Sequence, residues 1–237
     1  MDRRVEPEFL DELLADDPRA LQSRRDLQRL NRWMGNSQIM ARALQSCFSG
    51  HRARYVAELG AGDGIFMLRV AERLAGNGGP AKPTITVTLL DKQNIIRPET
   101  EKALQALGWR AELVQADVFD WLRQSSPEPC DGIFANLFLH HFSDAQLAAL
   151  FDYAARRARF FVAVEPRRWL WSVWFGRLLW LIGCNEVTRH DARVSIRAGF
   201  TGRELSQLWP ADENWSLLEE PANLASHLFI ANRQDQK

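Results

Sequence analysis

Three glycines at alternate positions follow an acidic residue at the end of an apolar run. The stretch reads "YVAELGAGDGIF", with Glu58 two positions before Gly60, Gly62 and Gly64. Glycine lacks a Cβ atom, so the backbone of such a turn can lie directly against a ligand. The helical pattern that follows points its free N–H groups at the same place. The pattern predicts a ligand site beyond the carboxyl end of a strand. The alternative is a tight turn with no ligand.

The acid at Glu58 limits which ligand this is. A dinucleotide-binding turn reads GxGxxG, whereas this one reads GxGxG. A carboxylate near the turn would repel a pyrophosphate and attract a protonated amino group. The sequence therefore favours a nucleoside that carries an amino acid, and it disfavours a nicotinamide-dependent oxidoreductase.

Polar residues also end the next three predicted strands. Asp91 in "LLDK" can accept hydrogen bonds from both ribose hydroxyls. Asp117 in "QADVF" can accept one from an adenine amine, with Val118 or Phe119 packed beside the purine. Asn136 in "FANLF" would lie near the reacting end. Alternatively, Asp91 is a helix N-cap and Asp117 caps a turn.

Together these strand ends resemble the class I S-adenosylmethionine-dependent methyltransferases of the small-molecule type. "VAELGAGDG" is similar to their first motif, "LLDK" to their second acidic position, "QADVF" to their adenine loop, and "DGIFANLFLHHF" to their fourth strand. The resemblance implies S-adenosylmethionine as cofactor, with its methionine part at Glu58 and Gly60, its ribose at Asp91 and its adenine at Asp117 and Val118. The cofactor contacts expected in this way are Glu58, Gly60, Ala61, Gly62, Gly64, Asp91, Lys92, Asp117, Val118 and Asn136.

His140 and His141 are the candidate catalytic bases. An imidazole near its ordinary pKa of about 6.5 can take a proton from a phenol or an enol at neutral pH. Adjacent residues are expected to face different ways, so at most one should touch the substrate. The alternative is that one of them packs beneath the cofactor. His190, beside Asp191, is a second candidate, unless both belong to a surface loop with salt bridges.

A tryptophan-rich segment, "RRWLWSVWFGRLLWLIG" at 167–183, follows the fifth predicted strand. It is too short, and too interrupted by Arg177, to cross a bilayer. We expect a lid over a flat apolar acceptor, although a helix packed on the N-terminal helices or an interfacial membrane contact is also consistent with it. The expected acceptor contacts are Trp33, Glu165, Trp169 and His190.

The elements that must position these residues alternate along the chain. Strands are predicted at 54–59, 84–91, 110–117, 130–138 and 159–166, with helical segments between them. Strands separated by helices form parallel sheets covered on both faces. Two final strands, at 215–220 and 226–233, are too close together for a crossover and form an antiparallel hairpin.

The sequence thus predicts an α/β fold with a doubly wound, mostly parallel seven-stranded sheet and an antiparallel C-terminal hairpin. An N-terminal helical extension should occupy residues 1–50, with Gly35 and Asn36 kinking or splitting its second helix. A Rossmann-like methyltransferase domain should follow at 51–237, with a helical lid insertion at 167–200.

Composition narrows the partners. Thirty basic and thirty acidic residues leave no net charge, which argues against a nucleic-acid partner. Three separated cysteines show no metal-ligand spacing, so no metal is expected, and they indicate reduced thiols. The charged N-terminus lacks a signal-peptide pattern, so we expect a cytoplasmic protein, as a monomer or a homodimer.

The predicted reaction is methylation of a small hydrophobic acceptor, best matched by O-methylation of a phenolic, quinol or polyketide-like compound. C-methylation of an activated ring needs a similar cleft and base. A catalytically silent scaffold that binds S-adenosylmethionine is the alternative from a different class.

Overall fold

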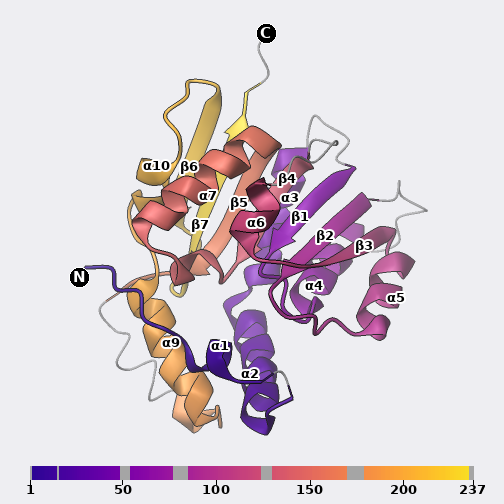
Figure 1. Ribbon diagram of the computed structural model, residues 1–237, viewed down its shortest axis with the longest axis vertical. Helices are drawn as coiled ribbons and strands as arrows, with labels where there is room; N and C mark the ends of the chain where they lie inside the picture. The colour runs from indigo at the N-terminus through magenta and orange to yellow at the C-terminus, as the bar shows by residue number, and fades with distance from the viewer. Residues whose placement is uncertain are drawn as a thin grey trace.

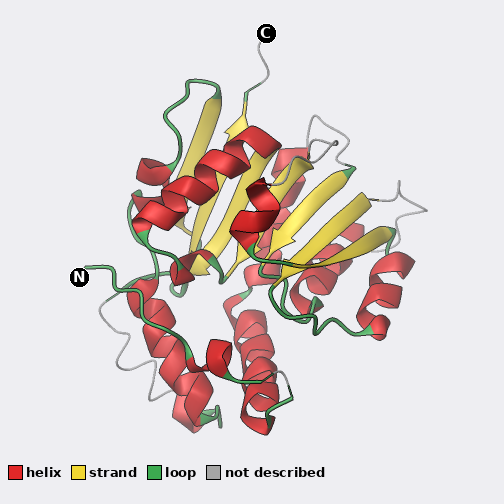
Figure 2. Cartoon of the chain, viewed as in Figure 1, coloured by secondary structure: helices red, strands yellow, loops and turns green. Residues whose placement is uncertain are grey.

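A seven-stranded sheet with the order β3-β2-β1-β4-β5-β7-β6 forms the centre of the computed structural model (Figures 1 and 2). The structure describes residues 2–14, 16–48, 54–76, 85–123, 130–169 and 179–234. Strands β1 to β5 run parallel, and β7 is antiparallel to both β5 and β6. The strands are β1 (Tyr55–Leu59), β2 (Ile85–Asp91), β3 (Trp109–Gln115), β4 (Cys130–Asn136), β5 (Ala158–Pro166), β6 (Trp215–Pro221) and β7 (Ser226–Arg233).

Helices cover both faces of the sheet, as parallel strands require. On one face, apolar residues of α3 (Asn36–Phe48), α4 (Ile65–Ala75) and α5 (Pro98–Ala106) pack with Val56 and Phe134. On the other, those of α6 (Val118–Arg123), α7 (Asp144–Arg157) and α10 (Glu204–Leu208) pack with Leu59 and Phe161. Because side chains alternate along a strand, each strand supplies both cores. In Figure 1, α7 lies in front of the sheet and α3 behind it.

The predicted sheet, its parallel pairing and the C-terminal hairpin are confirmed. The strand boundaries shift by at most two residues, and α7 is one of the predicted helical segments between the strands. Gly35 splits the N-terminal helix: with φ of 69°, it ends α2 (Pro18–Met34) before α3 starts at Asn36.

Two further helices follow β3 and the tryptophan-rich segment. Residues Val118–Arg123 form α6, so Val118 lies in a helix and is buried. Residues Glu186–Ala198 form α9, which places His190 on a helix and corrects the alternative of a surface loop. Asn185 caps α9 by accepting a hydrogen bond from Thr188 N at 2.8 Å.

Helices α2 and α9 extend below the carboxyl edge of the sheet (Figure 1). The buried Asp26 of α2 joins them, accepting hydrogen bonds from Asn185 N at 2.9 Å and Thr188 Oγ1 at 3.2 Å. Residues 2–14, which we call the N-terminal arm, include the short α1 (Phe9–Glu12), which lies between α2 and α9. One cavity is thus enclosed by the carboxyl edge of the sheet, α2, α9 and the N-terminal arm.

Side chains at each end of the arm hold it to the rest of the protein. Arg3 donates to Ala198 O at 2.9 Å and to Phe142 O at 2.6 Å. The main-chain N–H groups of Phe9 and Leu10 donate to the carboxylate of Asp191 at 2.9 and 3.0 Å.

Much of the tryptophan-rich segment, including Trp171 and Trp174, lies outside the described residues, so its function as a lid remains a prediction. Trp180 and Leu181, in the described final part of the segment, are 65% and 72% exposed. Within the described part of the chain, no helix combines the length and the apolar character that a membrane span requires.

Gly132 in β4 tests how tightly the sheet packs. A Cβ atom there would stand 1.8 Å from Cζ of the buried Phe160. Gly132→Ala should therefore cost about 1–3 kcal/mol of unfolding free energy, measured by urea denaturation. Adding Phe160→Leu should recover part of that loss, because the smaller side chain leaves room. An alanine at position 132 with unchanged stability would contradict this packing.

Candidate functional site

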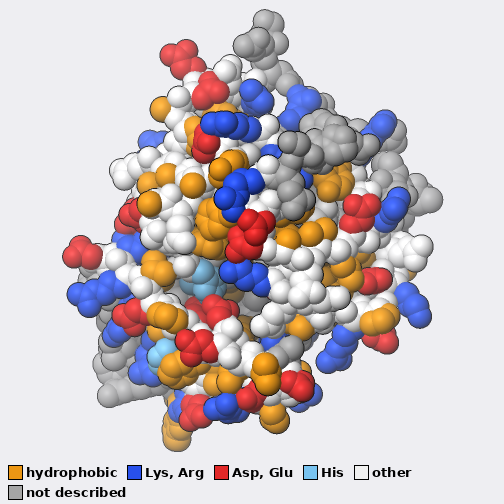
Figure 3. All heavy atoms as spheres, in the orientation of Figure 1, with side chains coloured by type: hydrophobic (Ala, Val, Ile, Leu, Met, Phe, Trp, Pro, Cys, Tyr) orange, Lys and Arg blue, Asp and Glu red, His pale blue; other side chains and the backbone are white. Residues whose placement is uncertain are grey.

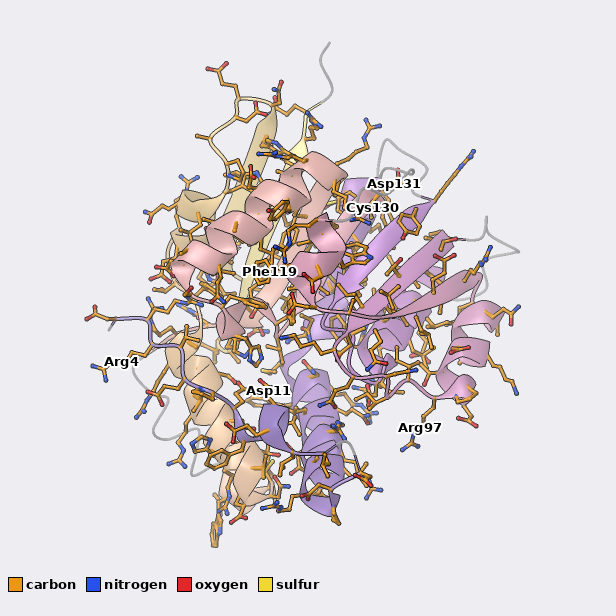
Figure 4. The ribbon with its side chains drawn as sticks, in the orientation of Figure 1. Arg4, Asp11, Arg97, Phe119, Cys130 and Asp131 are labelled. Carbon is orange, nitrogen blue, oxygen red and sulfur yellow. The ribbon has the colours of Figure 1, made fainter. Side chains whose placement is uncertain are left out.

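A cavity of about 1240 Å³ lies along the carboxyl ends of the strands. It reaches from Asp91, at the end of β2, past Glu58 and Asn136 to Leu224, in the turn between β6 and β7. The strand order reverses between β1 and β4, the crevice where open α/β sheets bind ligands. Figure 4 shows Asp11, another lining residue, between α9 and α2 beneath the sheet.

The three glycines of the turn have positive φ angles of 56–73°, but they serve different purposes. A Cβ atom at Gly60 would stand 2.3 Å from the ring of Phe138, so this glycine makes room for a side chain. At Gly62, no atom of the described residues lies within 4 Å of such a Cβ, and Gly62 lines the cavity. Gly64 precedes α4 and lies near Thr100. Gly62 is therefore the position where a ligand can approach the backbone.

Glu58 lines the cavity although it is only 2% exposed. Its Oε2 has no hydrogen-bond partner among the described residues. Burial, and then the negative charges of Asp63 and Asp91, raise the pKa of this carboxyl well above its ordinary value. A buried carboxyl without a partner is costly, and a cation in the cavity would relieve it. The glycine turn therefore suits a positively charged ligand group.

Asp91 is held in place by the backbone. Its carboxylate accepts hydrogen bonds from Gly62 N and Gln93 N, each at 2.8 Å, and it lines the cavity. Arg97, not Asp91, occupies the N-cap position of α5, so the alternative of a helix N-cap is wrong. Two N–H donors fix the carboxylate that was predicted to bind ribose.

The predicted adenine contacts lie partly outside the cavity. Val118 and Lys92 line it, but Asp117 is not one of the described residues that do. Its carboxylate accepts a hydrogen bond from Phe119 N at 2.8 Å and pairs with Lys92 at 3.1 Å. Partial burial raises the pKa of Asp117, but these two contacts outweigh it and lower the pKa overall. Asp117 thus caps the start of α6, and its contact with adenine stays a prediction.

Asn136 lines the cavity and is bound to the N-terminal helices. Its Oδ1 accepts from Asn36 Nδ2 at 3.0 Å, and its Nδ2 donates to Asn31 at 3.3 Å. Ser226 completes the network by donating to Asn36. These bonds join β4 to α2 and α3, an arrangement that the strand pattern gave no reason to expect.

A buried cluster surrounds His140. Glu165, predicted to contact the acceptor, is instead fully buried behind the cavity wall, where its carboxylate accepts hydrogen bonds from the main-chain N–H groups of residues 138–140. His140 Nδ1 lies 2.8 Å from Glu165 and its Nε2 lies 3.3 Å from Glu8 of the N-terminal arm. Ser195 of α9 donates a hydrogen bond to the same Glu8 oxygen. Glu8 and Ser195 both line the cavity, and sequence reasoning missed both.

These charges change the expected chemistry of His140. Burial lowers its pKa, but Glu165 and Glu8 more than offset this and raise it to about 9. Burial likewise raises the pKa of Glu8, and the contacts with His140 lower it to about 2. At neutral pH His140 is therefore an imidazolium, and the assumption of an ordinary pKa is wrong.

His141 lies beside His140 on η1 (Leu139–His141) and also lines the cavity. The ring centroids are 4.3 Å apart, so the expectation that the two rings face different ways is wrong. The side chain of His141 is 25% exposed, with Nδ1 3.4 Å from Asp11. Figure 3 shows histidine side chains on the face where α9 and the arm lie.

One ligand atom from each of Glu8, His140 and His141 lies within 4.8 Å of the others. Ligands of a first-row metal ion stand about 2.0–2.2 Å from it and therefore roughly 3–4 Å from one another. Nε2 of His140 already faces Glu8 at 3.3 Å, and the raised pKa of His140 keeps a proton on the ring where a metal would need a free lone pair. The arrangement favours a charge-paired cluster over a metal centre.

Of the remaining predicted acceptor contacts, two line the cavity and one does not. Trp33, which is 68% exposed, and Trp169 both line the cavity. His190 is not among the described lining residues: it stacks on Phe9 at 3.8 Å and bonds to Asp191 at 3.0 Å. Leu137 was not predicted, yet it lines the cavity with an unusual φ of 51°, backbone strain of the kind that clusters at functional sites.

Comparison with known proteins adds to this geometry. No protein-family model matches the sequence, and no curated protein matches it. The plantazolicin methyltransferase BpumL, solved in complex with SAH (S-adenosylhomocysteine), is similar in structure, with a TM-score of 0.64, 13% identity and coverage of 92% of each chain. This chain has the class I S-adenosylmethionine-dependent methyltransferase fold.

Two other solved structures share this methyltransferase fold. One is an O-methyltransferase family protein from Burkholderia thailandensis, with a TM-score of 0.60 and 17% identity, and the other is the mitomycin 7-O-methyltransferase MmcR, with 0.52 and 18%. The match covers 94% of this chain in both cases, and the chain spans only 62% and 60% of those proteins.

The charged cluster predicts a pH dependence of stability. Because the pKa of His140 is raised to about 9, its pairing stabilises the fold fully below the ordinary pKa of about 6.5 and is lost as the pH rises through 9. His140→Gln should therefore lower the melting temperature by several degrees at neutral pH, and the gap should narrow above pH 9. A gap that stays constant between pH 6 and pH 10 would contradict the charged state of His140.

Proposed function

We propose that this protein transfers a methyl group from S-adenosylmethionine to an oxygen of a small hydrophobic acceptor, of the phenolic, quinol or polyketide-like class. The observation that carries the cofactor assignment is Glu58, whose Oε2 is buried in the cavity without a partner among the described residues. A phosphate there would add charge to an acidic corner. An ammonium group would neutralise it.

The residues around the glycine turn fit the other parts of the cofactor. Gly62 leaves its backbone open to the cavity, and Asp91 offers an oriented carboxylate for the ribose hydroxyls. Bound there, the cofactor would supply an activated methyl group on a sulfonium. What the protein must add is the alignment of the acceptor with that methyl group.

The other walls of the cavity favour an apolar acceptor. Leu27 and Met34 of α2, together with Ile196 of α9, line it and are only partly buried by protein atoms. Its volume exceeds the roughly 300–1,000 Å³ that normally encloses one drug-sized ligand. The space therefore accommodates a cofactor and a hydrophobic acceptor together.

Two imidazoles in the cavity wall support oxygen as the accepting atom. A hydroxyl becomes a good nucleophile when its proton is lost, and His141, which is partly exposed, is the available proton acceptor. His140, held as a cation, can bind the oxygen that results. Similarity in fold to an O-methyltransferase family protein and to the mitomycin 7-O-methyltransferase is consistent with this.

Asp91→Ala should weaken the binding of S-adenosylhomocysteine at least tenfold in calorimetric titrations, because it removes the ribose acceptor and the bond that holds Gly62. Asp120→Ala is the matched control: it removes an exposed carboxylate that pairs with Arg123 outside the cavity, and should leave the affinity unchanged. Equal affinity of both variants and the wild type would overturn the assignment of Asp91.

Incubation with S-adenosylmethionine and a panel of phenols and quinols tests the reaction, with the methylated position read by NMR. His141→Ala should lower turnover about 10²-fold or more while S-adenosylhomocysteine binds as before. A product methylated on a ring carbon would show that carbon, and not oxygen, accepts the methyl group. A protein that binds the cofactor tightly but methylates none of these compounds would contradict the proposed function.

A further inference from the structure

Glu8 occupies a position that matters for the proposed function, on which the following inference rests. Its Oε1 lies 3.3 Å from Nε2 of His140 and also accepts a hydrogen bond from Oγ of Ser195. Two donors from different elements, η1 and α9, thus converge on one carboxylate oxygen inside the cavity. Both donors belong to residues that line the cavity wall.

Glu165, on the side of the ring away from Glu8, makes His140 a hydrogen-bond donor. Glu165 is fully buried, and it accepts hydrogen bonds from main-chain N–H groups and from Nδ1 of His140. Such a carboxylate holds a proton on Nδ1 and orients the ring. The second nitrogen of the ring then presents its own proton to whatever lies in front of it, and that partner is Glu8.

The other charged groups near His140 do not compete for this position. His141 lies beside the ring, tilted against it by 34°, and its own Nδ1 faces Asp11. Arg3 reaches the main-chain oxygen of His140 at 3.5 Å but bonds more closely to Phe142 O and Asp144. Glu8 is therefore the group that faces Nε2 directly.

Glu8 also belongs to the N-terminal arm, a segment that can detach locally from the rest of the protein. Its neighbours in the N-terminal arm, Glu6, Pro7 and Phe9, are exposed. Hydrogen bonds, ion pairs and the stacking of Phe9 on His190 hold the arm, and α1 contributes no buried side chain to a hydrophobic core. Segments with few buried apolar contacts open at low free-energy cost.

We propose that His140 Nε2 and Ser195 Oγ form the subsite for an ionised acceptor oxygen, and that the Glu8 carboxylate holds this subsite until the acceptor displaces it. The ligand class is an acidic hydroxyl compound, such as an electron-poor phenol or an enol, bound as its anion. The cationic ring and the hydroxyl are matched to an anionic oxygen in the way that they are matched to the carboxylate.

Once the hydroxyl has lost its proton, to solvent or to His141, the transfer step needs no further base. A lone pair of the phenolate oxygen forms the new bond to the methyl carbon, and the carbon–sulfur bond breaks with its electron pair going to sulfur. The sulfonium becomes a neutral thioether and the acceptor a neutral ether. The neutral ether no longer competes with Glu8, whose return to His140 favours product release.

The test uses 4-nitrophenol, whose ionised form absorbs visible light, added to the full-length protein saturated with S-adenosylhomocysteine. The wild type should bind it as the phenolate, with the apparent pKa of the bound phenol lowered. Glu8→Ala should bind the phenolate about tenfold more tightly, because the competing carboxylate is gone. Neutral 4-nitroanisole should show no such gain.

Two further variants sharpen the comparison. Glu12→Ala removes an equal charge from the same arm, at an exposed residue that is not among the described residues lining the cavity, and should leave phenolate affinity unchanged. Ser195→Ala should weaken phenolate binding, since it removes one donor. In the wild type, bound phenolate should also speed hydrogen exchange at Phe9 and Leu10, a readout that needs no variant to fold.

The outcomes separate the two proposals. The subsite is wrong if Glu8→Ala leaves the phenolate affinity unchanged or lowers it. It is also wrong if bound phenolate does not speed hydrogen exchange at Phe9 and Leu10. If the subsite results hold but phenols are never methylated, the subsite stands and the proposed function fails. If phenols are methylated while Glu8→Ala gains no affinity, the proposed function stands and the subsite fails.

Discussion

The fold places in the cavity wall a buried carboxyl, Glu58, whose Oε2 has no hydrogen-bond partner among the described residues. Glu58 lies one residue before the end of β1, between the β2 and β4 strands, and the surrounding protein excludes water from it. Such a group is tolerated when it is neutral or when a cation joins it. Asp63 and Asp91 disfavour its ionisation further. The acidic corner explains why the glycine turn suits an ammonium and not a diphosphate.

A second buried carboxylate, Glu165, shows the opposite solution to the same constraint. Its oxygens accept hydrogen bonds from main-chain N–H groups and from His140, and these bonds organise the segment after β4. The strain at Leu137 is part of that organisation, because it turns the chain so that residues 138–140 face Glu165. One carboxylate thus serves the cofactor side of the cavity and the other the acceptor side.

The parts that local sequence determines could be predicted. The glycine turn, Glu58, Asp91 and the strands depend on spacing and on residue type over a few positions. The cluster around His140 could not be predicted, because Glu8 and Ser195 reach it from elements 132 residues before and 55 residues after it, and no spacing links them. Helix α9 falls within the predicted helical insertion at 167–200, but local sequence could not show that His190 stacks on Phe9 of the N-terminal arm instead of lining the cavity.

The cofactor assignment requires that the buried carboxyl of Glu58, whose pKa is raised by burial, ionises when an ammonium group binds. Calorimetric titration of S-adenosylhomocysteine at about pH 6, in buffers of different ionisation enthalpy, measures the protons exchanged on binding. We expect that the wild type releases protons on binding and that Glu58→Gln releases fewer and binds more weakly. Binding of the same strength by both proteins, with no proton release, would contradict the cofactor assignment.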